Sequence, residues 1–176
     1  HTVSIGAEES GTERNATQIL EFAGMPSSLV ATKNLDYIEA TKELKAGDID
    51  AFFCTAGLTT TVIDELSKEC DIRLIPLTDT VISKMLESSS AYTSEVIPAG
   101  TYTGQDTAIS TIGVKSVLIT KSDVSDDTIE QLTSLLFEKE NELSYSNSLK
   151  LELTYDFATD GIPIPFHNGA KRYYED

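Results

Sequence analysis

The chain has 176 residues, of which 40% are hydrophobic and 24% are charged, a composition typical of a globular protein and not of a disordered or collagen-like one. Its 29 acidic and 13 basic residues give a net charge of −16, which opposes binding to nucleic acid and to anionic membranes. No apolar run reaches the roughly 20 residues of a transmembrane helix. Cys54 and Cys70 belong to no CxxC motif or Cys/His cluster, so we expect neither a metal site nor a cofactor.

A strand, a loop and a helix are predicted at the start of the chain. Residues 3–6 are a short apolar strand, and residues 6–12 are a polar loop that contains glycine. The helix that follows ends at Gly24, because glycine readily adopts the left-handed conformation that stops a helix. Its apolar residues recur at the spacing of one buried face: Ala16, Ile19, Leu20 and Ala23.

The next two predicted elements are a capped helix and a buried strand. Asp36 and Glu39 form a capping-box pattern at the start of the helix, and Gly47 follows its basic last turn. Residues 49–54 are a nearly continuous apolar strand. Strands of this kind are typical of a parallel sheet that is covered on both faces.

The middle of the chain continues the alternation of helices and strands. We expect a helix that ends near Lys68, a strand over residues 72–76 that stops at its proline, and a short helix capped by Asp79. Strands that alternate with amphipathic helices indicate an α/β fold.

The last part of the chain is predicted to be less regular. Residues 92–112 are rich in Ser, Thr, Gly and Pro and are expected to be extended and irregular, before a strand over residues 112–120. Ser125 is the predicted N-cap of a long helix. The prolines keep residues 162–165 extended, and Asn168 can cap a final short helix.

The loop at residues 6–12 is a candidate anion site. A loop between a strand and a helix directs free N–H groups and the positive end of the helix dipole to one point. In a parallel sheet that point lies at the carboxyl ends of the strands, where ligands of α/β folds bind. The alternative is a reciprocal capping box of Ser10 and Glu13, which needs no ligand. The loop matches neither the P-loop nor the GxGxxG motif.

Residues 55–57 repeat this geometry after the next predicted strand, so two loops with free N–H groups can converge at one sheet edge. An ordinary turn of small residues is the alternative. Phe52 and Phe53 point to opposite faces of their strand, so at most one of them reaches a cleft. Tyr92 and Tyr102 either form an amphipathic wall for a small ligand or are scattered surface residues.

Catalytic motifs are absent from the sequence. Ser10 lacks the GxSxG nucleophile elbow, and His167 lies in a turn far along the chain. Asp48 and Asp50 share a strand face but are better explained as a solvated edge or a loop cap than as metal ligands. We therefore expect no catalytic residue and no enzymatic activity.

Four stretches are informative together, because they follow one another in a recognisable order over almost the whole chain. They are Gly6–Ala16, Asp48–Gly57, Ile97–Tyr102 and Gly161–Tyr174. In residues and order they resemble the TAXI family of TRAP-transporter solute-binding proteins.

The resemblance implies a type II periplasmic-binding-protein-like α/β fold with two lobes hinged around a cleft. Residues 3–110 then form one complete α/β lobe, the second ligand-binding lobe, and residues 111–176 are the C-terminal segment that returns to the first lobe. A signal segment and the remainder of the first lobe are expected upstream of this chain. An unpaired sheet edge in residues 111–176 is expected to allow self-association of the fragment.

The resemblance also implies a ligand site and a role. The ligand-binding residues it implies are Ser10, Gly11, Thr12, Asn15, Thr55, Ala56 and Gly57, to which the sequence pattern adds Phe53 and Tyr102. Family members often have Gly-Gly where this chain has Ala56-Gly57, which alters that wall of the site.

The expected role is capture of a small organic anion or amino acid, such as glutamate or a dicarboxylate. The protein would do so outside the cytoplasm, in the periplasm or as a cell-surface lipoprotein, and deliver the solute to TRAP transporter membrane subunits. A ligand sensor that signals through a partner protein and an enzyme on the same fold are the alternatives.

Overall fold

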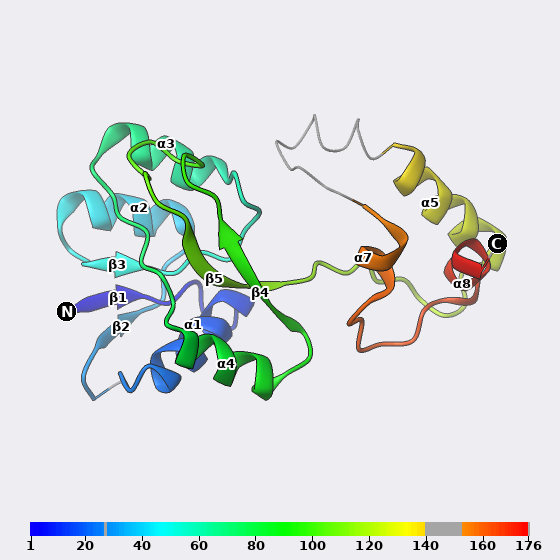
Figure 1. Cartoon of the computed structure of the whole chain (residues 1–176), viewed down its shortest axis with the longest axis horizontal. Coiled ribbons are helices and arrows are strands. Elements are labelled where there is room, and N and C mark those ends of the chain that lie inside the picture. The colour runs from blue at the N-terminus through cyan, green and yellow to red at the C-terminus, as the bar shows by residue number, and fades with distance from the viewer. Residues whose placement is uncertain (27, 140–152, 176) are drawn as a thin grey trace. The chain divides into compact units, whose positions relative to one another are not determined.

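A computed structural model describes residues 1–26, 28–139 and 153–175 of the chain (Figure 1). The chain divides into two compact units. The first unit contains residues 1–89 and 93–113, and the second contains residues 90–92 and 114–176. The assignment of residues 3–110 and 111–176 to two ligand-binding lobes stays a prediction.

A small parallel sheet lies at the centre of the first unit. Its strands, in the order β2-β1-β3, are β1 (Thr2–Ser4), β2 (Ala31–Lys33) and β3 (Ala51–Phe52). Val3 lies opposite Thr32 on one side and Ala51 on the other. The predicted strand over residues 49–54 is observed only at its centre, because β3 pairs with a strand of three residues.

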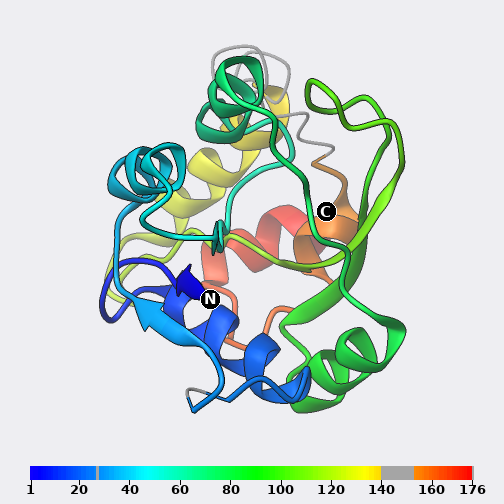
Figure 2. The same ribbon diagram turned by 90° about the vertical axis from the view of Figure 1, so that its left-hand side faces the viewer.

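Four helices surround this sheet: α1 (Gly11–Phe22), α2 (Tyr37–Ala46), α3 (Thr61–Glu69) and α4 (Asp79–Ser88). Figures 1 and 2 show α1 and α4 on one face of the sheet and α2 on the other, with α3 packed beside α2. The buried core under α1 contains Ile5, Ala16 and Leu20, with Phe53 packed against it. The predicted mixed α/β architecture is thus present in this unit.

The helix ends follow the local chemistry of the sequence. The predicted capping box of Asp36 and Glu39 is present at α2, and Gly47 ends that helix in the left-handed conformation. Gly24 is also left-handed, with φ of +72°, just beyond α1. The predicted cap of α4 is wrong by one residue: the Thr78 hydroxyl accepts from the N–H of Val81, and Asp79 is the first helical residue.

The strand predicted over residues 72–76 is not observed. Ile72 and Leu74 are half-buried while Ile75 is 72% exposed, so the alternating apolar pattern is real but forms no ladder. Pro76 has no N–H to give a neighbouring strand, and Leu77 donates its N–H to the carbonyl of Ser110 (2.9 Å). The segment therefore has no regular secondary structure.

Residues 92–112 are more regular than expected. They contain β4 (Tyr92–Ile97) and the start of β5 (Ile109–Val114), which pair in a two-stranded sheet. The glycine and proline signals belong only to the turn between them, where the Gly100 N–H donates to the carbonyl of Gln105 (2.7 Å). The strand predicted over residues 112–120 ends at Val114, because residues 115–120 pair with no strand in the described part of the chain.

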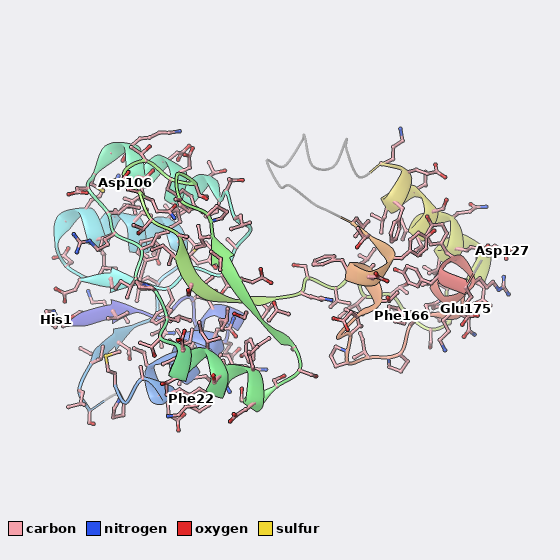
Figure 3. The ribbon with its side chains drawn as sticks, in the orientation of Figure 1. His1, Phe22, Asp106, Asp127, Phe166 and Glu175 are labelled. Carbon is pink, nitrogen blue, oxygen red and sulfur yellow. The ribbon has the colours of Figure 1, made fainter. Side chains whose placement is uncertain are left out.

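The second unit is helical in its described residues. Its helices are α5 (Asp126–Glu138), α7 (Tyr155–Thr159) and α8 (Asn168–Glu175). The predicted N-cap of α5 is confirmed, since the Ser125 hydroxyl accepts from the N–H of Thr128 (3.2 Å). Between α5, α7 and α8 lies an aromatic cluster, of which Phe166 is labelled in Figure 3: Phe137, Tyr155, Phe166, Tyr173 and Tyr174.

Candidate functional site

The loop between β1 and α1 folds tightly onto the start of its helix. Gly6 has φ of +99°, and a Cβ at this position would lie 2.7 Å from Cβ of Thr12. Only glycine fits here without strain or a shift of the chain. Glu9 is also left-handed, with φ of +60°, and the side-chain amide of Asn34 donates to the Gly6 carbonyl (3.1 Å). The loop is therefore held in one conformation from both ends.

The predicted capping box of Ser10 and Glu13 is only half formed. The Ser10 hydroxyl accepts from the N–H of Glu13 (3.1 Å), as expected. The Glu13 carboxylate instead accepts from the N–H of Glu9 (2.6 Å) and from Asn34 (2.8 Å), because the Ser10 N–H is used by the carbonyl of Ala7 (3.1 Å). Glu13 thus closes the loop, and the N–H groups of Gly11 and Thr12 remain at the start of α1.

The second predicted loop lies beside the first. The Asn15 amide donates to the Thr55 hydroxyl (3.4 Å), and the Tyr37 hydroxyl contacts both the Thr12 hydroxyl (2.9 Å) and the main chain of Thr55. Thr55, Ala56 and Gly57 are exposed. The structure therefore brings together the two loops that the sequence analysis placed at one sheet edge.

Tyr37 is the residue of this arrangement that the sequence analysis missed. It is the first residue of α2, and it follows β2 as Gly11 follows β1. Helices that follow parallel strands begin at the same sheet edge. A tyrosine in the first turn of such a helix was the available signal.

Two residues proposed for the site are buried or half-buried in the first unit. Phe53 is half-buried and packs against the core beneath α1, and its role as a ligand contact stays a prediction. Tyr102 is 7% exposed, and its hydroxyl donates to the carbonyl of Leu58. Burial raises the pKa of Tyr102 above its usual value. Tyr102 therefore braces the loop after β3 from within, and its contact with a ligand stays a prediction.

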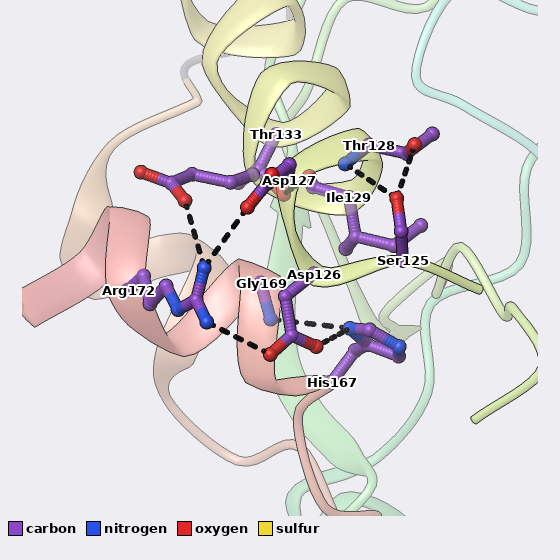
Figure 4. Close-up of polar contacts among 10 residues, drawn as sticks. Ser125, Asp126, Asp127, Thr128, Ile129, Thr133, His167, Gly169 and Arg172 are labelled. Atoms are coloured by element: carbon purple, nitrogen blue, oxygen red, sulfur yellow. Dashed lines mark hydrogen bonds and ion pairs between the residues drawn. The ribbon is translucent and has the colours of Figure 1, made fainter. Parts of the chain in front are cut away.

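A second polar cluster lies in the second unit, where α8 crosses the start of α5 (Figure 4). Arg172 contacts the carboxylates of Asp126 (3.0 Å), Asp127 (3.2 Å) and Glu130 (3.7 Å). His167 Nδ1 accepts from the Gly169 N–H (3.1 Å) and lies 3.8 Å from the Asp126 carboxylate. These groups use one another as partners, so the cluster joins two helices.

Two surface hollows are found in the described residues. One, of about 170 Å³, lies between α2 and α3, and Tyr37 is one of its lining residues. The other, of about 590 Å³, runs along α5 beside Tyr173. The described residues contain no group of three or more His, Cys, Asp or Glu side chains that could hold a metal ion, and none of their helices is long and apolar enough to cross a bilayer.

Comparison with known protein families identifies the class of protein. A mixed α/β chain with a small parallel sheet and helices is consistent with a periplasmic-binding-like fold. The sequence model of the NMT1-like family matches residues 1–176, so the chain belongs to the NMT1-like family, a periplasmic solute-binding family. Family membership indicates an extracytoplasmic solute-binding role.

Proposed function

We propose that this chain is the solute-binding part of an extracytoplasmic receptor of the TAXI type, which binds a small organic anion and delivers it to TRAP transporter membrane subunits. The observation that carries the proposal is the convergence of two loops: Ser10–Thr12 at the start of α1, and Thr55–Gly57 after β3, joined through Tyr37. Binding without chemical conversion is part of the proposal.

The anion is bound by the start of α1. The Ser10 hydroxyl oxygen accepts from Glu13, so its hydrogen is available to a ligand oxygen. The first-turn N–H groups of Gly11 and Thr12 point the same way and carry the positive end of the helix dipole. A carboxylate is the ligand group of choice, because it accepts several such hydrogen bonds at once. The solute class is a small carboxylic acid or amino acid such as glutamate.

The electrostatics of this site depend on short-range contacts. The net charge of −16 repels an anion at long range, whereas the helix start attracts it within its first turn. Added salt screens the long-range repulsion more than the contacts in the site. Affinity for a carboxylate is therefore expected to hold or rise as ionic strength increases, in contrast to a site on a basic surface.

The test is a thermal-shift panel of small carboxylates, amino acids and inorganic phosphate on this chain. A ligand at about 100 times its Kd adds roughly 2.7 kcal/mol, which is a shift of about 5 to 10 °C. We expect a carboxylate to shift the wild-type chain and Ser125→Ala but to shift Ser10→Ala much less. Ser125→Ala is the matched control, because Ser125 also caps a helix through its hydroxyl (3.2 Å) but lies in the other unit.

Three results would count against the proposal. If no carboxylate shifts the unfolding temperature, small carboxylic acids are not the ligands of this site. If the ligand-induced thermal shift falls equally in Ser10→Ala and Ser125→Ala, only helix capping was changed. Conversion of the bound acid to a product, followed by chromatography of the reaction mixture, replaces the binding role with an enzymatic one.

A further inference from the structure

The hydroxyl of Tyr37 lies between the two loops of the candidate site. Its oxygen is 2.9 Å from the Thr12 hydroxyl, 3.0 Å from the Thr55 carbonyl and 3.1 Å from the Thr55 nitrogen. One side chain thus contacts segments that are 25 residues and 18 residues away in the chain. Tyr37 is also one of the residues that line the hollow between α2 and α3.

The hydrogen atoms of these contacts can be assigned by elimination. A carbonyl only accepts, so the single hydroxyl hydrogen of Tyr37 is donated to the Thr55 carbonyl. The Thr55 N–H then donates to the Tyr37 oxygen. Because the Tyr37 hydrogen is already used, the contact with Thr12 is one in which the Thr12 hydroxyl donates. Tyr37 therefore makes these three hydrogen bonds and has no further hydrogen to give, and the Cys54 side chain is a further polar neighbour of its hydroxyl.

This assignment changes the role of Thr12. Its side chain is buried, and its hydroxyl hydrogen is committed to Tyr37. The Thr12 hydroxyl consequently cannot donate to a ligand carboxylate, whereas the Ser10 hydroxyl can, because Ser10 uses only its oxygen in capping α1.

The main chain at Tyr37 is itself held in place. Tyr37 follows Asp36, whose carboxylate accepts from the Glu39 N–H (2.8 Å), while the Glu39 carboxylate accepts from the Asp36 N–H (3.4 Å). A reciprocal box of this kind fixes the first turn of a helix. The hydroxyl is thus presented from a rigid support, as the positioning of a binding site requires.

We propose that Tyr37 is the positioning residue of the solute site. It holds the Ser10–Thr12 and Thr55–Gly57 loops at a fixed separation and takes up the hydroxyl hydrogen of Thr12. The anionic group is then received by the Ser10 hydroxyl and by main-chain N–H groups. This inference rests on the proposed function for its ligand, but the bridge between the loops is testable without one.

The first experiment measures amide hydrogen exchange in the unliganded chain. In Tyr37→Phe the Thr55 N–H loses its acceptor and is expected to exchange about tenfold faster or more. The Phe53 N–H donates to the Ser4 carbonyl (2.9 Å) and is the internal reference, because this bond does not involve Tyr37. An unchanged rate at Thr55 would overturn the bridge, and an equal acceleration at Phe53 would show general loosening instead.

The second experiment measures affinity for L-glutamate by calorimetry. Tyr37→Phe and Thr12→Val are each expected to weaken binding about 5- to 15-fold, and Thr12→Ser is expected to restore it to within about twofold, because serine keeps the donor. Since Thr12 acts through Tyr37, the double variant should bind no worse than either single one. Tyr155→Phe, which removes a tyrosine hydroxyl in the other unit, is the control and should bind as the wild type does.

The outcomes separate this inference from the proposed function. If the affinity of the double variant falls by the product of the two single-variant factors, the Thr12 side chain contacts the ligand directly. That result would overturn the positioning role of Tyr37. Failure of L-glutamate to bind the wild-type chain counts against the proposed ligand. The exchange rate at Thr55 then still decides whether Tyr37 holds the two loops together.

Discussion

The two units of the chain are stabilised in different ways. In the first unit three parallel strands pair through the main chain, and helices bury apolar residues such as Met85 and Ala16, both 0% exposed. In the second unit the described part contains three helices, and the contact between the crossing helices α5 and α8 is made by a glycine, an aromatic cluster and an arginine among carboxylates. Its apolar residues include Leu118 at 68% and Ile119 at 75% exposure. Depth of burial sets stability in the first unit, and close local contacts set it in the second.

Shortening one apolar side chain in each unit is the sharpest test of this difference. Met85→Ala in α4 removes a fully buried side chain and is expected to lower the free energy of unfolding by about 3 kcal/mol. Leu135→Ala in α5 removes a side chain that is 50% exposed and is expected to cost less than about 1 kcal/mol. Urea unfolding of both variants measures the two losses. Equal losses would contradict the comparison.

The crossing of α5 and α8 depends on the absence of a side chain at one position. A Cβ at Gly169 would lie 2.1 Å from the carbonyl oxygen of Asp126 and 2.9 Å from the nitrogen of Glu130. Both atoms are main chain, so the helices must separate to admit it. Gly169→Ala is expected to cost about 2 kcal/mol, measured by urea unfolding and by faster amide exchange in α5.

Gly11→Ala is the control for this substitution. Gly11 also lies in the first turn of a helix, but a Cβ there would meet no atom within 4 Å. The free energy of unfolding of Gly11→Ala is expected to stay within about 0.5 kcal/mol of the wild type. If Gly169→Ala is as mild as Gly11→Ala, the close approach of the two helices is not what stabilises the second unit.

The helix ends could be predicted from the sequence, and most strands could not. A cap needs only a residue three positions away, so Ser10, Asp36 and Ser125 were each predicted as caps and are observed as caps. A strand needs a partner from elsewhere in the chain. Residues 72–76 and 115–120 have strand-like sequences but pair with no strand in the described part, while residues 92–97 pair with β5.

The candidate site was predicted in outline only. The two loops were recognised because glycine and small polar residues follow apolar strands, and a parallel sheet places such loops at one edge. Tyr37 was not recognised, because its contacts with Thr12 and Thr55 depend on the packing of α2 beside the sheet. For Phe53 the alternation along a strand does not say which face is the core, and the structure packs its side chain partly against the core beneath α1.

Within the sheet of the first unit, one buried group is predicted to oppose folding. Ser4 is 1% exposed, and its hydroxyl has no hydrogen-bond partner among the described residues. Such a group costs about 1 to 3 kcal/mol, so Ser4→Ala is expected to raise stability by about 1 kcal/mol. Ser67→Ala is the matched control, because the buried Ser67 hydroxyl donates to the Asp64 carbonyl (2.8 Å) and its loss is expected to lower stability by a similar amount. If thermal unfolding shows that both variants are less stable than the wild type, the Ser4 hydroxyl has a hydrogen-bond partner.

The aromatic cluster of the second unit is predicted to make that unit sensitive to alkaline pH. A side-chain hydrogen bond with Tyr155 is the largest cause that raises the pKa of Tyr173 from 10.0 to about 12, and burial and neighbouring charges add to it. Because the folded chain favours the protonated phenol, the stabilisation is complete below pH 10 and is lost as the pH rises toward 12. Titration of the Tyr173 ring carbons by NMR should follow this range. In Tyr155→Phe the Tyr173 midpoint should fall toward 10. The Tyr102 midpoint, which is raised by burial, is the control and should not change. An unchanged Tyr173 midpoint in that variant would show that the two hydroxyls are not hydrogen-bond partners, and the aromatic cluster would then act in the second unit by ring packing alone.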